Sequence, residues 1–419
     1  MKALILGRGV SGRGAACLLG SLGFSYQFYQ DGDCAPDVSM FDFAVRSPGF
    51  PINHKILRLL RAKNVPTLGE IELAFRFSRG KIVSITGTNG KSTTTALIHT
   101  ALKTNGYKTF IGGNFGTPFS EFALKTKPET VSVIELSSFQ IEDLKSYRSD
   151  ISVVLNITPD HMNRYRDFHE YAETKLKLLK HSDIAILNRD DPQLRSTKGD
   201  NIIFFSRKER ADAYVDSEKI VVNLKKKTEI PLPELPLKGV HNLENYMAAA
   251  TVLNLLGLTE DEIIRGFKAF NGLPHRTEFV GTVKKVKFIN DSKSTNPDSL
   301  KKALESFEKV ILIAGGSSKG LDFRELKELF KERVKGAVFI GETAELLAET
   351  FKGLSPILRA SSMEEAVRKA FELSKPGDTV LLSPGCASFD MFKNFEERGE
   401  AFKKAVLKLK RDLEEKVEN

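Results

Sequence analysis

Residues 81–95 read KIVSITGTNGKSTTT, in which a run of β-branched residues is followed by glycines, a lysine and several hydroxyl groups. The run at 81–86 predicts a strand, because β-branched side chains favour extended backbone. The glycines allow backbone N–H groups to approach an anion, and a helix from Ser92 would direct the positive end of its dipole toward that anion. An ammonium group at Lys91 and a hydroxyl at Ser92 suit the β- and γ-phosphates and Mg²⁺. We therefore predict a strand, phosphate loop and helix that bind ATP through Gly87, Thr88, Asn89, Gly90, Lys91, Ser92 and Thr93.

The loop departs from the usual pattern GxxxxGK[ST] at its first position. The pattern requires glycine at position 85, where this chain has Ile85, so we interpret the loop as a shortened variant. A glycine turn that merely precedes a helix is the alternative. We favour the phosphate loop because a strand, GxxGKS and a helix coincide here.

The length of 419 residues suggests two to four domains, and the patterns of strand and helix alternate along the chain. We predict an α/β protein of three domains. Residues 1–70 would form a Rossmann-like half-site and residues 71–271 a central parallel sheet of the P-loop ATPase type. Residues 272–419 would form a C-terminal Rossmann-like domain.

The formal net charge of +9 is distributed along the chain. Basic residues alternate with acids in segments such as 325–335, and no block of like charge resembles a nucleic-acid-binding tail. An anionic small substrate explains this balance as well as nucleic acid, which is the lesser alternative. We therefore expect no nucleic-acid partner.

Cysteine usage and hydrophobic run lengths predict a cytoplasmic protein. The three cysteines form no CxxC pair, and their odd number argues against a disulfide framework. The apolar run at 3–6 is too short for a signal peptide, and no stretch of eighteen apolar residues lacks charge. We expect no membrane span and a monomer.

The N-terminal segment contains a second nucleotide-binding signature. Residues 7–12 read GRGVSG, which matches GxGxxG between a predicted strand at 3–6 and an apolar helix at 14–22. A second strand ends beside Asp31, where dinucleotide sites place an acid near a ribose hydroxyl. Alone, these residues predict an NAD-binding oxidoreductase, but a segment of this length has room for one mononucleotide half. We predict a nucleotide half-site with a further loop at Ser47, Pro48 and Gly49; a tight turn that serves packing only is the alternative.

Polar residues also follow the predicted strands of the central segment. The strand at 131–136 places Glu135 at its end, and the strand at 151–155 leads into Asp160 and His161. The carboxyl ends of parallel strands share the ligand edge of a sheet, so we predict that Glu135 holds Mg²⁺ and that His161 contacts metal or phosphate. A solvated strand end and a helix-start histidine are the alternatives. From its spacing on a helix, Lys175 is a surface lysine.

The third segment repeats the alternation of strand and helix. Strands predicted at 287–290, 310–314 and 379–382 lead into NDSKSTN, GGSSKGLD and SPGCASFD, and a further strand is predicted at 337–340. Three polar loops at one sheet edge predict a substrate site. Structural turns alone would explain one of them.

Taken together, the ordered motifs resemble those of the ATP-dependent Mur ligases of peptidoglycan synthesis. The motifs are GTNGKST, ELSSFQ, NITPDHMNRY, YAETK, GVHNLEN, GLPHRTE, NDSKSTN, GGSSKGLDF and SPGCASFDMFKNFEERGEAF. The resemblance spans all three segments. The last motif and the N-terminal GRGVSG with SPG favour the family member that adds D-glutamate.

The resemblance implies a ligase that forms an amide bond at the expense of ATP. The carboxylate of UDP-N-acetylmuramoyl-L-alanine would attack the γ-phosphate, and the amine of D-glutamate would displace phosphate from the acyl phosphate. The first segment would bind the uridine nucleotide and no NAD, and the third segment would close over the second.

The resemblance also implies roles for particular residues. Lys91, Glu135, His161 and Lys175 would serve catalysis. Two Mg²⁺ ions would be held by Ser92, Glu135, His161 and Lys175, the last as a carbamate derived from CO₂. Besides the phosphate loop, ATP would meet Asn245, Arg276 and Asp291. The substrates would meet Val10, Ser11, Asp31, Ser47, Pro48, Gly49, Asn114, Ser137, Lys293, Thr295, Lys319, Ser388, Phe389 and Phe395. Ser317 departs from the acid that some members have at its position.

Three other functions remain open from the sequence. A folylpolyglutamate-type ligase shares the acyl-phosphate chemistry but has no UDP-linked substrate, which the N-terminal half-site disfavours. An NAD oxidoreductase follows from GxGxxG alone. A regulatory P-loop protein would hydrolyse ATP slowly and form no amide.

Overall fold

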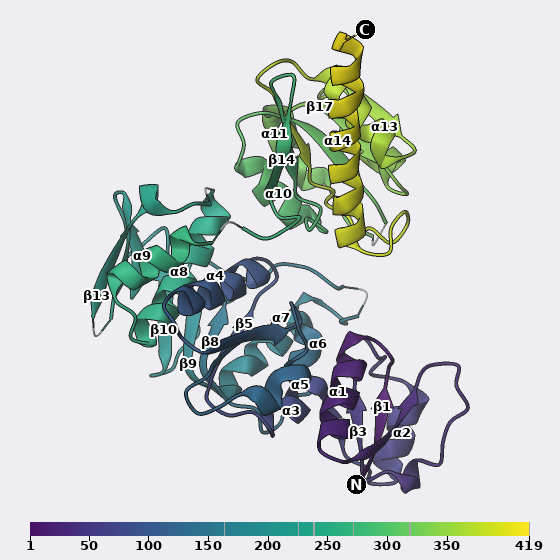
Figure 1. The fold of residues 1–419 in the computed structure, drawn as a ribbon, viewed down its shortest axis with the longest axis vertical. Coiled ribbons are helices and arrows are strands. Elements are labelled where there is room, and N and C mark those ends of the chain that lie inside the picture. Colours follow the sequence, from purple (N-terminus) through teal and green to yellow (C-terminus); the bar gives the residue numbers. More distant parts are fainter. Residues whose placement is uncertain (163, 225, 238, 271, 318–319, 419) are drawn as a thin grey trace. The chain divides into compact units, whose positions relative to one another are not determined.

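The computed structural model describes residues 1–162, 164–224, 226–237, 239–270, 272–317 and 320–418. The chain forms two compact units. The first unit combines Met1–Pro236 with Leu243–Phe270, and the second combines Leu237–Asn242 with Asn271–Asn419. Three sheets organise the described residues, two in the first unit and one in the second (Figure 1).

The N-terminal sheet has four parallel strands in the order β2-β1-β3-β4. Its strands are β1 (Lys2–Leu6), β2 (Ser25–Tyr29), β3 (Phe43–Arg46) and β4 (Thr67–Gly69), with helices α1 (Val10–Ser21), α2 (Lys55–Ala62) and α3 (Glu70–Phe75) and the 3₁₀ turn η1 (Val38–Met40). Apolar residues of β1 and β3 are buried on both faces of this sheet. This matches the continuous apolar pattern of parallel strands.

Helix α1 begins at Val10, so the predicted start at Gly14 is wrong by about one turn. The glycines at 12 and 14 therefore lie inside the helix, where they allow close contacts rather than a turn. A Cβ at Gly12 would lie 2.1 Å from the carbonyl oxygen of Gly7, and a Cβ at Gly14 would lie 2.7 Å from Ser120 Oγ. The second contact lets α1 pack against α5 (Phe119–Phe122), a short helix of the central sheet (Figure 1).

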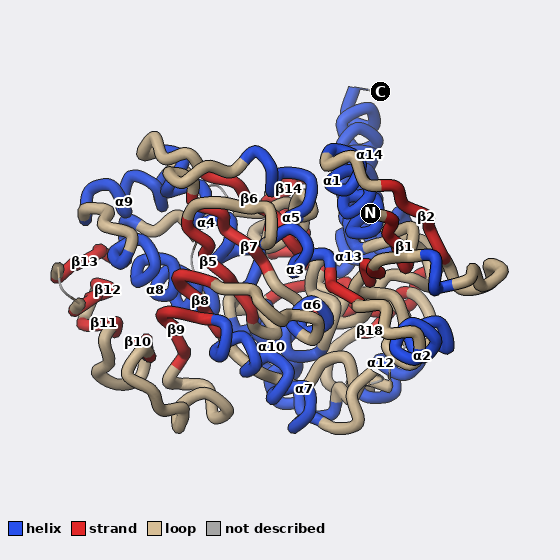
Figure 2. Tube along the Cα trace, turned by 90° about the horizontal axis from the view of Figure 1, so that it is seen from below, coloured by secondary structure: helices blue, strands red, loops and turns tan. Residues whose placement is uncertain are grey.

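The central sheet has nine strands in the order β13-β12-β11-β10-β9-β8-β5-β7-β6, and only β11, β12 and β13 pair in antiparallel fashion (Figure 2). The strands are β5 (Lys81–Thr86), β6 (Thr109–Gly113), β7 (Val131–Glu135), β8 (Ser149–Val154), β9 (Ser182–Asn188), β10 (Ile202–Ser206), β11 (Ala213–Asp216), β12 (Lys219–Asn223) and β13 (Lys227–Pro231). The helices are α4 (Lys91–Thr104), α5 (Phe119–Phe122), α6 (Ser138–Ile141), α7 (Phe168–Leu176), α8 (Val240–Leu255) and α9 (Glu260–Lys268), with η2 (Ala123–Lys125), η3 (Lys177–His181) and η4 (Leu232–Glu234). Strand β5 lies between β7 and β8, so the loop after it opens at the middle of the parallel part.

The third sheet has the order β14-β15-β19-β16-β17-β18, with only β14 antiparallel to its neighbour. The strands are β14 (Glu278–Val283), β15 (Val286–Asn290), β16 (Val310–Gly315), β17 (Val334–Ile340), β18 (Ile357–Ala360) and β19 (Thr379–Leu382). The helices are α10 (Pro297–Glu305), α11 (Lys327–Arg333), α12 (Ala344–Thr350), α13 (Met363–Leu373) and α14 (Phe395–Glu418), with η5 (Arg324–Leu326). One apolar cluster joins the sheet to α10, α11 and α12, and another joins it to α13 and α14.

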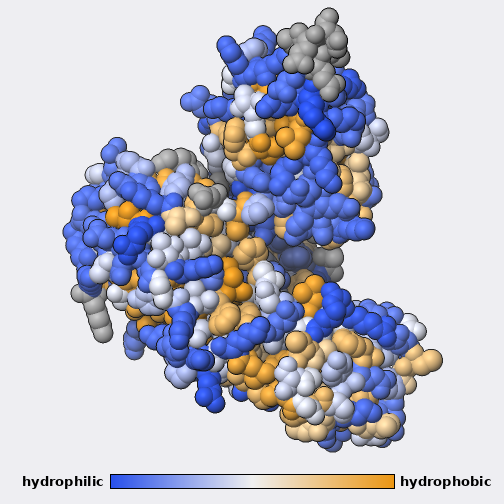
Figure 3. Space-filling view, in the orientation of Figure 1, coloured by the Kyte–Doolittle hydropathy of each residue, from blue (hydrophilic) through white to orange (hydrophobic). Residues whose placement is uncertain are grey.

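The predicted mixed α/β class with parallel-rich sheets is confirmed. The four strands predicted in the third segment are present, whereas β14 and β18 were not predicted. Hydrophilic and hydrophobic side chains are interspersed on the face shown in Figure 3. Within the described residues, no helix is both long and apolar enough to cross a membrane.

Candidate active site

The phosphate loop lies between β5 and α4 and is shaped by glycine conformations. Gly87 has a φ of 148° and Gly90 a φ of 87°, both in the region that glycine adopts without strain. A Cβ at Gly90 would lie 2.4 Å from Asn245 Oδ1, so a larger residue is excluded there. The same Asn245 oxygen accepts a hydrogen bond from Thr94 Oγ1 at 3.2 Å. Asn245 therefore lies against the phosphate loop, as the predicted nucleotide contact requires.

Neighbouring strands fix the rest of the loop. Asn156, just after β8, accepts from the backbone N–H of Asn89 at 2.8 Å and donates to its carbonyl at 3.0 Å. Thr88 Oγ1 donates to the carbonyl of Thr158 at 3.0 Å, and Thr93 is fully buried in the first turn of α4. The loop is thus held at the N-terminus of a 14-residue helix, a position that favours a bound phosphate.

Two lysines converge on one carbonyl oxygen in this loop. Lys91 Nζ and Lys175 Nζ each lie 2.9 Å from the carbonyl oxygen of Gly87, and Lys91 Nζ also donates to Thr88 at 2.8 Å. Lys175 is 1% exposed, so its assignment from spacing as a surface lysine is wrong. Burial, and then the charge of Lys91, lowers the pKa of Lys175 well below its usual value. Because this pKa is lowered, a larger share of the Lys175 amine is neutral at a given pH than in an exposed lysine.

Glu135 ends β7 directly beside the phosphate-loop strand. Register pairs it with Ile85 of β5 and with Gly113 of β6. Its Oε1 accepts a hydrogen bond from Asn114 Nδ2 at 2.8 Å. Glu135 as a whole is 2% exposed. The structure therefore brings together Asn114 and Glu135, two residues that the sequence places 21 positions apart.

Asp160 and His161 follow β8 at the same edge. His161 has a φ of 56°, and its backbone N–H donates to Asp160 Oδ1 at 2.8 Å. Its ring lies 4.9 Å from the ring of Phe139, between centroids. Ser137 caps α6 through a capping box with Gln140, which fixes the segment between Glu135 and Phe139.

The donors near the phosphate loop suit a magnesium ion that also binds nucleotide. Ser92 and Glu135 provide a buried hydroxyl and carboxylate, both hard oxygen donors. No group of three or more His, Cys, Asp and Glu side chains forms a metal site among the described residues. Mg²⁺ commonly takes one or two protein carboxylates and completes its shell with phosphate oxygens and water, so this sparse donor set fits the ion.

The predicted N-terminal site residues lie at the carboxyl ends of β1, β2 and β3. Val10 and Ser11 begin α1, and Ser47 follows β3 with its Oγ 3.0 Å from the position of a Cβ on Gly7. Pro48 and Gly49 continue the same loop. Asp31 Oδ1 lies 3.0 Å from Nε2 of His54. The other ring nitrogen of His54, Nδ1, accepts a hydrogen bond from the N–H of Ile56 and so caps α2. The structure thus brings the loops 7–12 and 47–49 together at one edge.

In the second unit, Arg276 lies between two non-glycine residues with positive φ. His275 has a φ of 62° and Thr277 a φ of 47°, conformations that are rare for such residues and often mark functional sites. The N–H of Thr277 donates to Asp291 Oδ1 at 3.2 Å, and Ser383 Oγ donates to Asp291 Oδ2 at 3.0 Å. Burial raises the pKa of Asp291 to about 6, against the lowering effect of Arg276. Arg276 and Asp291 are therefore close in space, as a shared role requires.

The predicted amino-acid residues occupy loops of the same sheet edge. Lys293 Nζ lies 5.2 Å from the ring centroid of Phe395, at the start of α14. Ser388 is buried in the loop after β19, whereas Phe389 is 70% exposed and touches little of the fold. Thr295 lies in the turn before α10. Lys319 lies outside the described residues.

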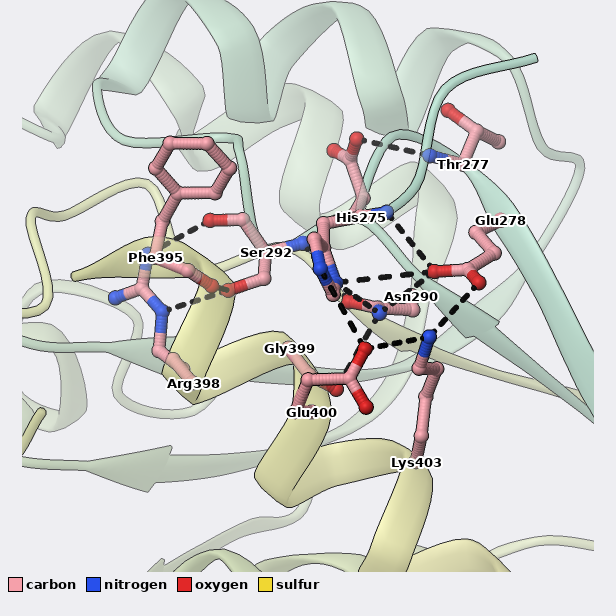
Figure 4. A network of polar contacts seen from close by, with 11 residues as sticks. His275, Thr277, Glu278, Asn290, Ser292, Phe395, Arg398, Gly399, Glu400 and Lys403 are labelled. Carbon is pink, nitrogen blue, oxygen red and sulfur yellow. Dashed lines mark hydrogen bonds and ion pairs between the residues drawn. The ribbon is translucent and has the colours of Figure 1, made fainter. Parts of the chain in front are cut away.

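A polar network around His275 was missed by sequence reasoning (Figure 4). His275 Nδ1 lies 3.0 Å from Asn290 Nδ2, whose amide also donates to Glu278 Oε2 at 3.0 Å. Lys403 of α14 lies 3.2 Å from Glu278 Oε1, with ion-pair geometry. The ring packs on Gly399, where a Cβ would lie 2.2 Å from Nδ1. The only sequence signal for this contact is the glycine in FEERGEAF.

Arg398 of the same helix ties together two of the predicted substrate loops. Its guanidinium donates to Ser292 Oγ at 3.0 Å and to the carbonyl of Ser292 at 2.8 Å (Figure 4). It also donates to the carbonyls of Cys386 and Ala387 at 3.0 and 3.2 Å. The side chain is 1% exposed. The loops after β15 and β19 are therefore fixed relative to each other by α14.

Two family models match the chain, the Mur ligase middle domain over residues 85–253 and the Mur ligase glutamate ligase domain over residues 275–386. A Pelotomaculum thermopropionicum protein named UDP-N-acetylmuramoylalanine–D-glutamate ligase is 44% identical to this chain, with 88% of this chain and 84% of that protein covered. A protein of the same name from Alkaliphilus metalliredigens is 43% identical with the same coverage.

Solved structures of related ligases share the fold. A pseudomurein peptide ligase type C from Methanothermus fervidus aligns with a TM-score of 0.68 at 18% identity, covering 98% of this chain and 100% of that chain. A UDP-N-acetylmuramate-alanine ligase from Thermotoga maritima aligns with a TM-score of 0.66 at 18% identity and the same coverage. At this identity the likeness concerns the fold alone.

Proposed function

The chain belongs to the Mur ligase family, and we propose that it joins D-glutamate to UDP-N-acetylmuramoyl-L-alanine in an ATP-dependent reaction of peptidoglycan precursor synthesis. The observation that supports this most directly is the phosphate loop with Lys91 and Lys175 on the Gly87 carbonyl and Glu135 on the adjacent strand. The sequence likeness to proteins named for this reaction extends over both units. NAD oxidation and folate glutamylation are disfavoured by the family.

The proposed chemistry begins with attack of the substrate carboxylate on the γ-phosphate of ATP. Two anions must approach each other, so the site needs positive charge where negative charge accumulates. Lys91 and the N-terminus of α4 supply such charge beside the loop 87–90. In the second step the amine of D-glutamate attacks the acyl phosphate carbon, the C–O bond to phosphate breaks, and the amine loses a proton.

We assign the metal-binding role to Ser92, Glu135, His161 and Lys175, for two Mg²⁺ ions. Bound Mg²⁺ would supply further neutralisation of phosphate charge. Lys175 would bind metal as a carbamate. Its neutral amine would attack CO₂, forming an N–C bond and releasing one proton. The lowered pKa of Lys175 supports this step, because only the neutral amine is nucleophilic.

The carbamate can be tested by ¹³C NMR of the protein equilibrated with ¹³C-bicarbonate. A carbamate signal that is present in the wild type and absent from Lys175→Arg is the expected result. Absence of the signal from the wild type at saturating bicarbonate would contradict the modification.

We propose that the substrates divide between the sheets. The UDP group would bind the loops of Val10, Ser11, Asp31, Ser47, Pro48 and Gly49, while Asn114 and Ser137 would meet the muramoyl part. The two carboxylates of D-glutamate require cations and hydroxyls, which Lys293, Thr295 and Ser388 would provide, together with Lys319, which lies outside the described residues. Phe389 and Phe395 would be further contacts of this substrate. Asn245, Arg276 and Asp291 would complete the ATP site. We also propose a division into three domains at about residues 70 and 271, and a monomer that works in the cytoplasm.

The function is tested by supplying Mg-ATP, UDP-N-acetylmuramoyl-L-alanine and a panel of D- and L-amino acids, and measuring phosphate release and the mass of the amide. Product with D-glutamate is expected. Additional products would indicate broader specificity and direct attention to Ser317, whose Oγ accepts from the N–H of Asp390 at 2.9 Å. No amide with any amino acid, although ATP binds, would overturn the assignment.

A further inference from the structure

A partly buried ion cluster connects the N-terminal sheet to two loops of the nucleotide site, and none of its members has a role in the proposed chemistry. We call Arg46, Glu142, Asp143, Arg164 and Tyr165 the Glu142 cluster. Arg46 ends β3, Glu142 and Asp143 follow α6, and the other two follow His161. The cluster therefore joins three segments that precede or follow proposed substrate and metal residues.

The first arm of the cluster holds the segment beside Ser47. Arg46 Nη2 lies 2.7 Å from Asp143 Oδ2 and 3.3 Å from Glu142 Oε2. Its Nη1 donates to the carbonyl of Phe50 at 3.0 Å, across the 47–49 loop. Because Arg46 is 1% exposed, its side chain has little freedom to move away from these partners. The two carboxylates thereby fix the base of the 47–49 loop.

The second arm leads to His161. Arg164 presents Nη2 and Nε to the two oxygens of Glu142, at 2.6 and 3.3 Å, and Tyr165 O–H donates to Glu142 Oε1 at 2.8 Å. The guanidinium carbon of Arg164 lies 3.8 Å from the ring centroid of Phe139. The same ring also pairs with the rings of His161 and Tyr165, at 4.9 and 6.2 Å between centroids. Glu142 therefore orients Arg164, which stacks on the ring that packs against His161.

Stability alone does not require charged residues at this place. Buried ion pairs lose solvation, and well-packed apolar residues of similar volume often stabilise a protein as much. What a bidentate Arg–carboxylate pair adds is fixed orientation, because the planar guanidinium matches the two oxygens in one geometry. Here one carboxylate orients two guanidinium groups, each adjacent to a different loop.

We propose that Glu142 is a positioning residue, which sets His161 through Arg164 and Phe139 and sets the 47–49 loop through Arg46. The role of these two loops rests on the proposed function. Asp143 contacts only the Arg46 arm among the cluster's arginines, so the two arms can be separated by mutation.

The kinetic test compares Glu142→Gln and Asp143→Asn with the wild type. Glu142→Gln keeps the shape of the side chain but removes its charge. Its kcat should fall by about 10- to 100-fold, because that is the effect of misplacing catalytic groups by up to about 1 Å. Asp143→Asn should raise KM for the UDP-substrate several-fold and leave kcat within about twofold. The matched control is Asp183→Asn, which breaks an exposed Arg148–Asp183 pair (2.6 Å) in the same unit, and it should change neither constant.

A spectroscopic test reads the position of His161 without turnover. The seven histidines can be ¹³C-labelled, the His161 signal assigned with His161→Gln, and the ring-current effect of Phe139 calibrated with Phe139→Leu. In Glu142→Gln the His161 signal should move toward its position in Phe139→Leu. In Asp183→Asn it should stay at the wild-type position.

The outcomes separate this inference from the proposed function. An unmoved His161 signal in Glu142→Gln overturns the inference, even if kcat falls. A wild type that forms no amide contradicts the proposed function, whereas the His161 signal still decides the inference. If Glu142→Gln does not fold, Arg164→Lys decides: it keeps a cation but loses the planar fork, and an unmoved His161 signal there would also overturn the proposal.

Discussion

The two compact units hold their ligand loops by different means. In the first unit the loop 87–90 takes its shape from its own glycines and from β7 and β8, the strands that pair with β5. In the second unit the loops after β15 and β19 are fixed by Arg398, more than a hundred residues beyond the first of them. The first site is thus held by its own glycines and by residues that follow a neighbouring strand of the same sheet, and the second by the last helix of the fold. Mutations in each unit can test this difference.

The largest expected effect concerns the first unit. Lys91→Met removes the ammonium group from a preformed phosphate loop, so kcat should fall by at least about 10²–10³, as for one electrostatic donor to a transition state. The fold should be retained, because the loop is held by Asn156 and its own glycines. Steady-state kinetics with Mg-ATP and circular dichroism measure the two quantities.

The control is Lys103→Met on the same helix, since Lys103 is exposed and lies outside the loop. Its kcat should equal that of the wild type. A Lys91→Met variant with more than a tenth of wild-type kcat would show that local charge in the loop is not what the first site depends on.

The second effect concerns the stability of the second unit. Arg398→Ala removes a buried guanidinium that satisfies Ser292 and the carbonyls of Cys386 and Ala387. Leaving these acceptors unsatisfied should lower the free energy of unfolding of this unit by at least about 3 kcal/mol. Hydrogen exchange under urea can follow β15 and β19 separately from the first unit.

The exposed Arg359 provides the matched control, because its pair with Glu345 at 2.8 Å lies in solvent. Arg359→Ala should leave exchange in β15 and β19 unchanged. If Arg398→Ala behaves like Arg359→Ala, α14 does not hold the two loops, and the contrast between the units fails.

The same difference explains how much the sequence could predict. The strand at 81–86 and the phosphate loop were predicted because pattern, glycine conformation and helix start lie within fifteen residues. Parallel-strand logic predicted that Glu135 lies at the ligand edge, and the register with β5 bears this position out. These inferences needed only local propensity and one topological rule.

The errors and omissions share the opposite cause. Lys175 was assigned to the surface because helical spacing cannot show that the Gly87 carbonyl lies beside it. The start of α1 was placed too late because Gly12 and Gly14 serve close packing with distant atoms. Arg398 and His275 were overlooked because their partners lie on other elements. In each case the missing information was a contact distant in sequence.

The smallest expected effect concerns a buried acid in the first unit. Burial raises the pKa of Glu70 to about 6, while hydrogen bonds from Ser120 oppose the rise. The folded state therefore binds this proton more tightly than the unfolded chain does. The contribution of protonated Glu70 to the free energy of unfolding is complete below the pKa of the unfolded chain, about 4.3. It is lost as pH rises through about 6, and the total loss is about 2 kcal/mol.

Glu70→Gln should remove this dependence, so its stability relative to the wild type should improve by about 2 kcal/mol between pH 4 and pH 7. Glu72, two residues further along α3, has a lowered pKa, because hydrogen bonds from Ser146 and nearby backbone N–H groups outweigh its burial. Glu72→Gln should accordingly show the opposite slope, losing stability relative to the wild type as pH rises.

Asp291 supplies the comparison in the second unit: its raised pKa gives Asp291→Asn the same sign as Glu70→Gln. Urea unfolding monitored by hydrogen exchange in each unit measures all three slopes. Equal slopes for Glu70→Gln and Glu72→Gln would show that burial does not set the ionisation of Glu70, whereas opposite slopes would show that two acids on one short helix are tuned by their separate contacts.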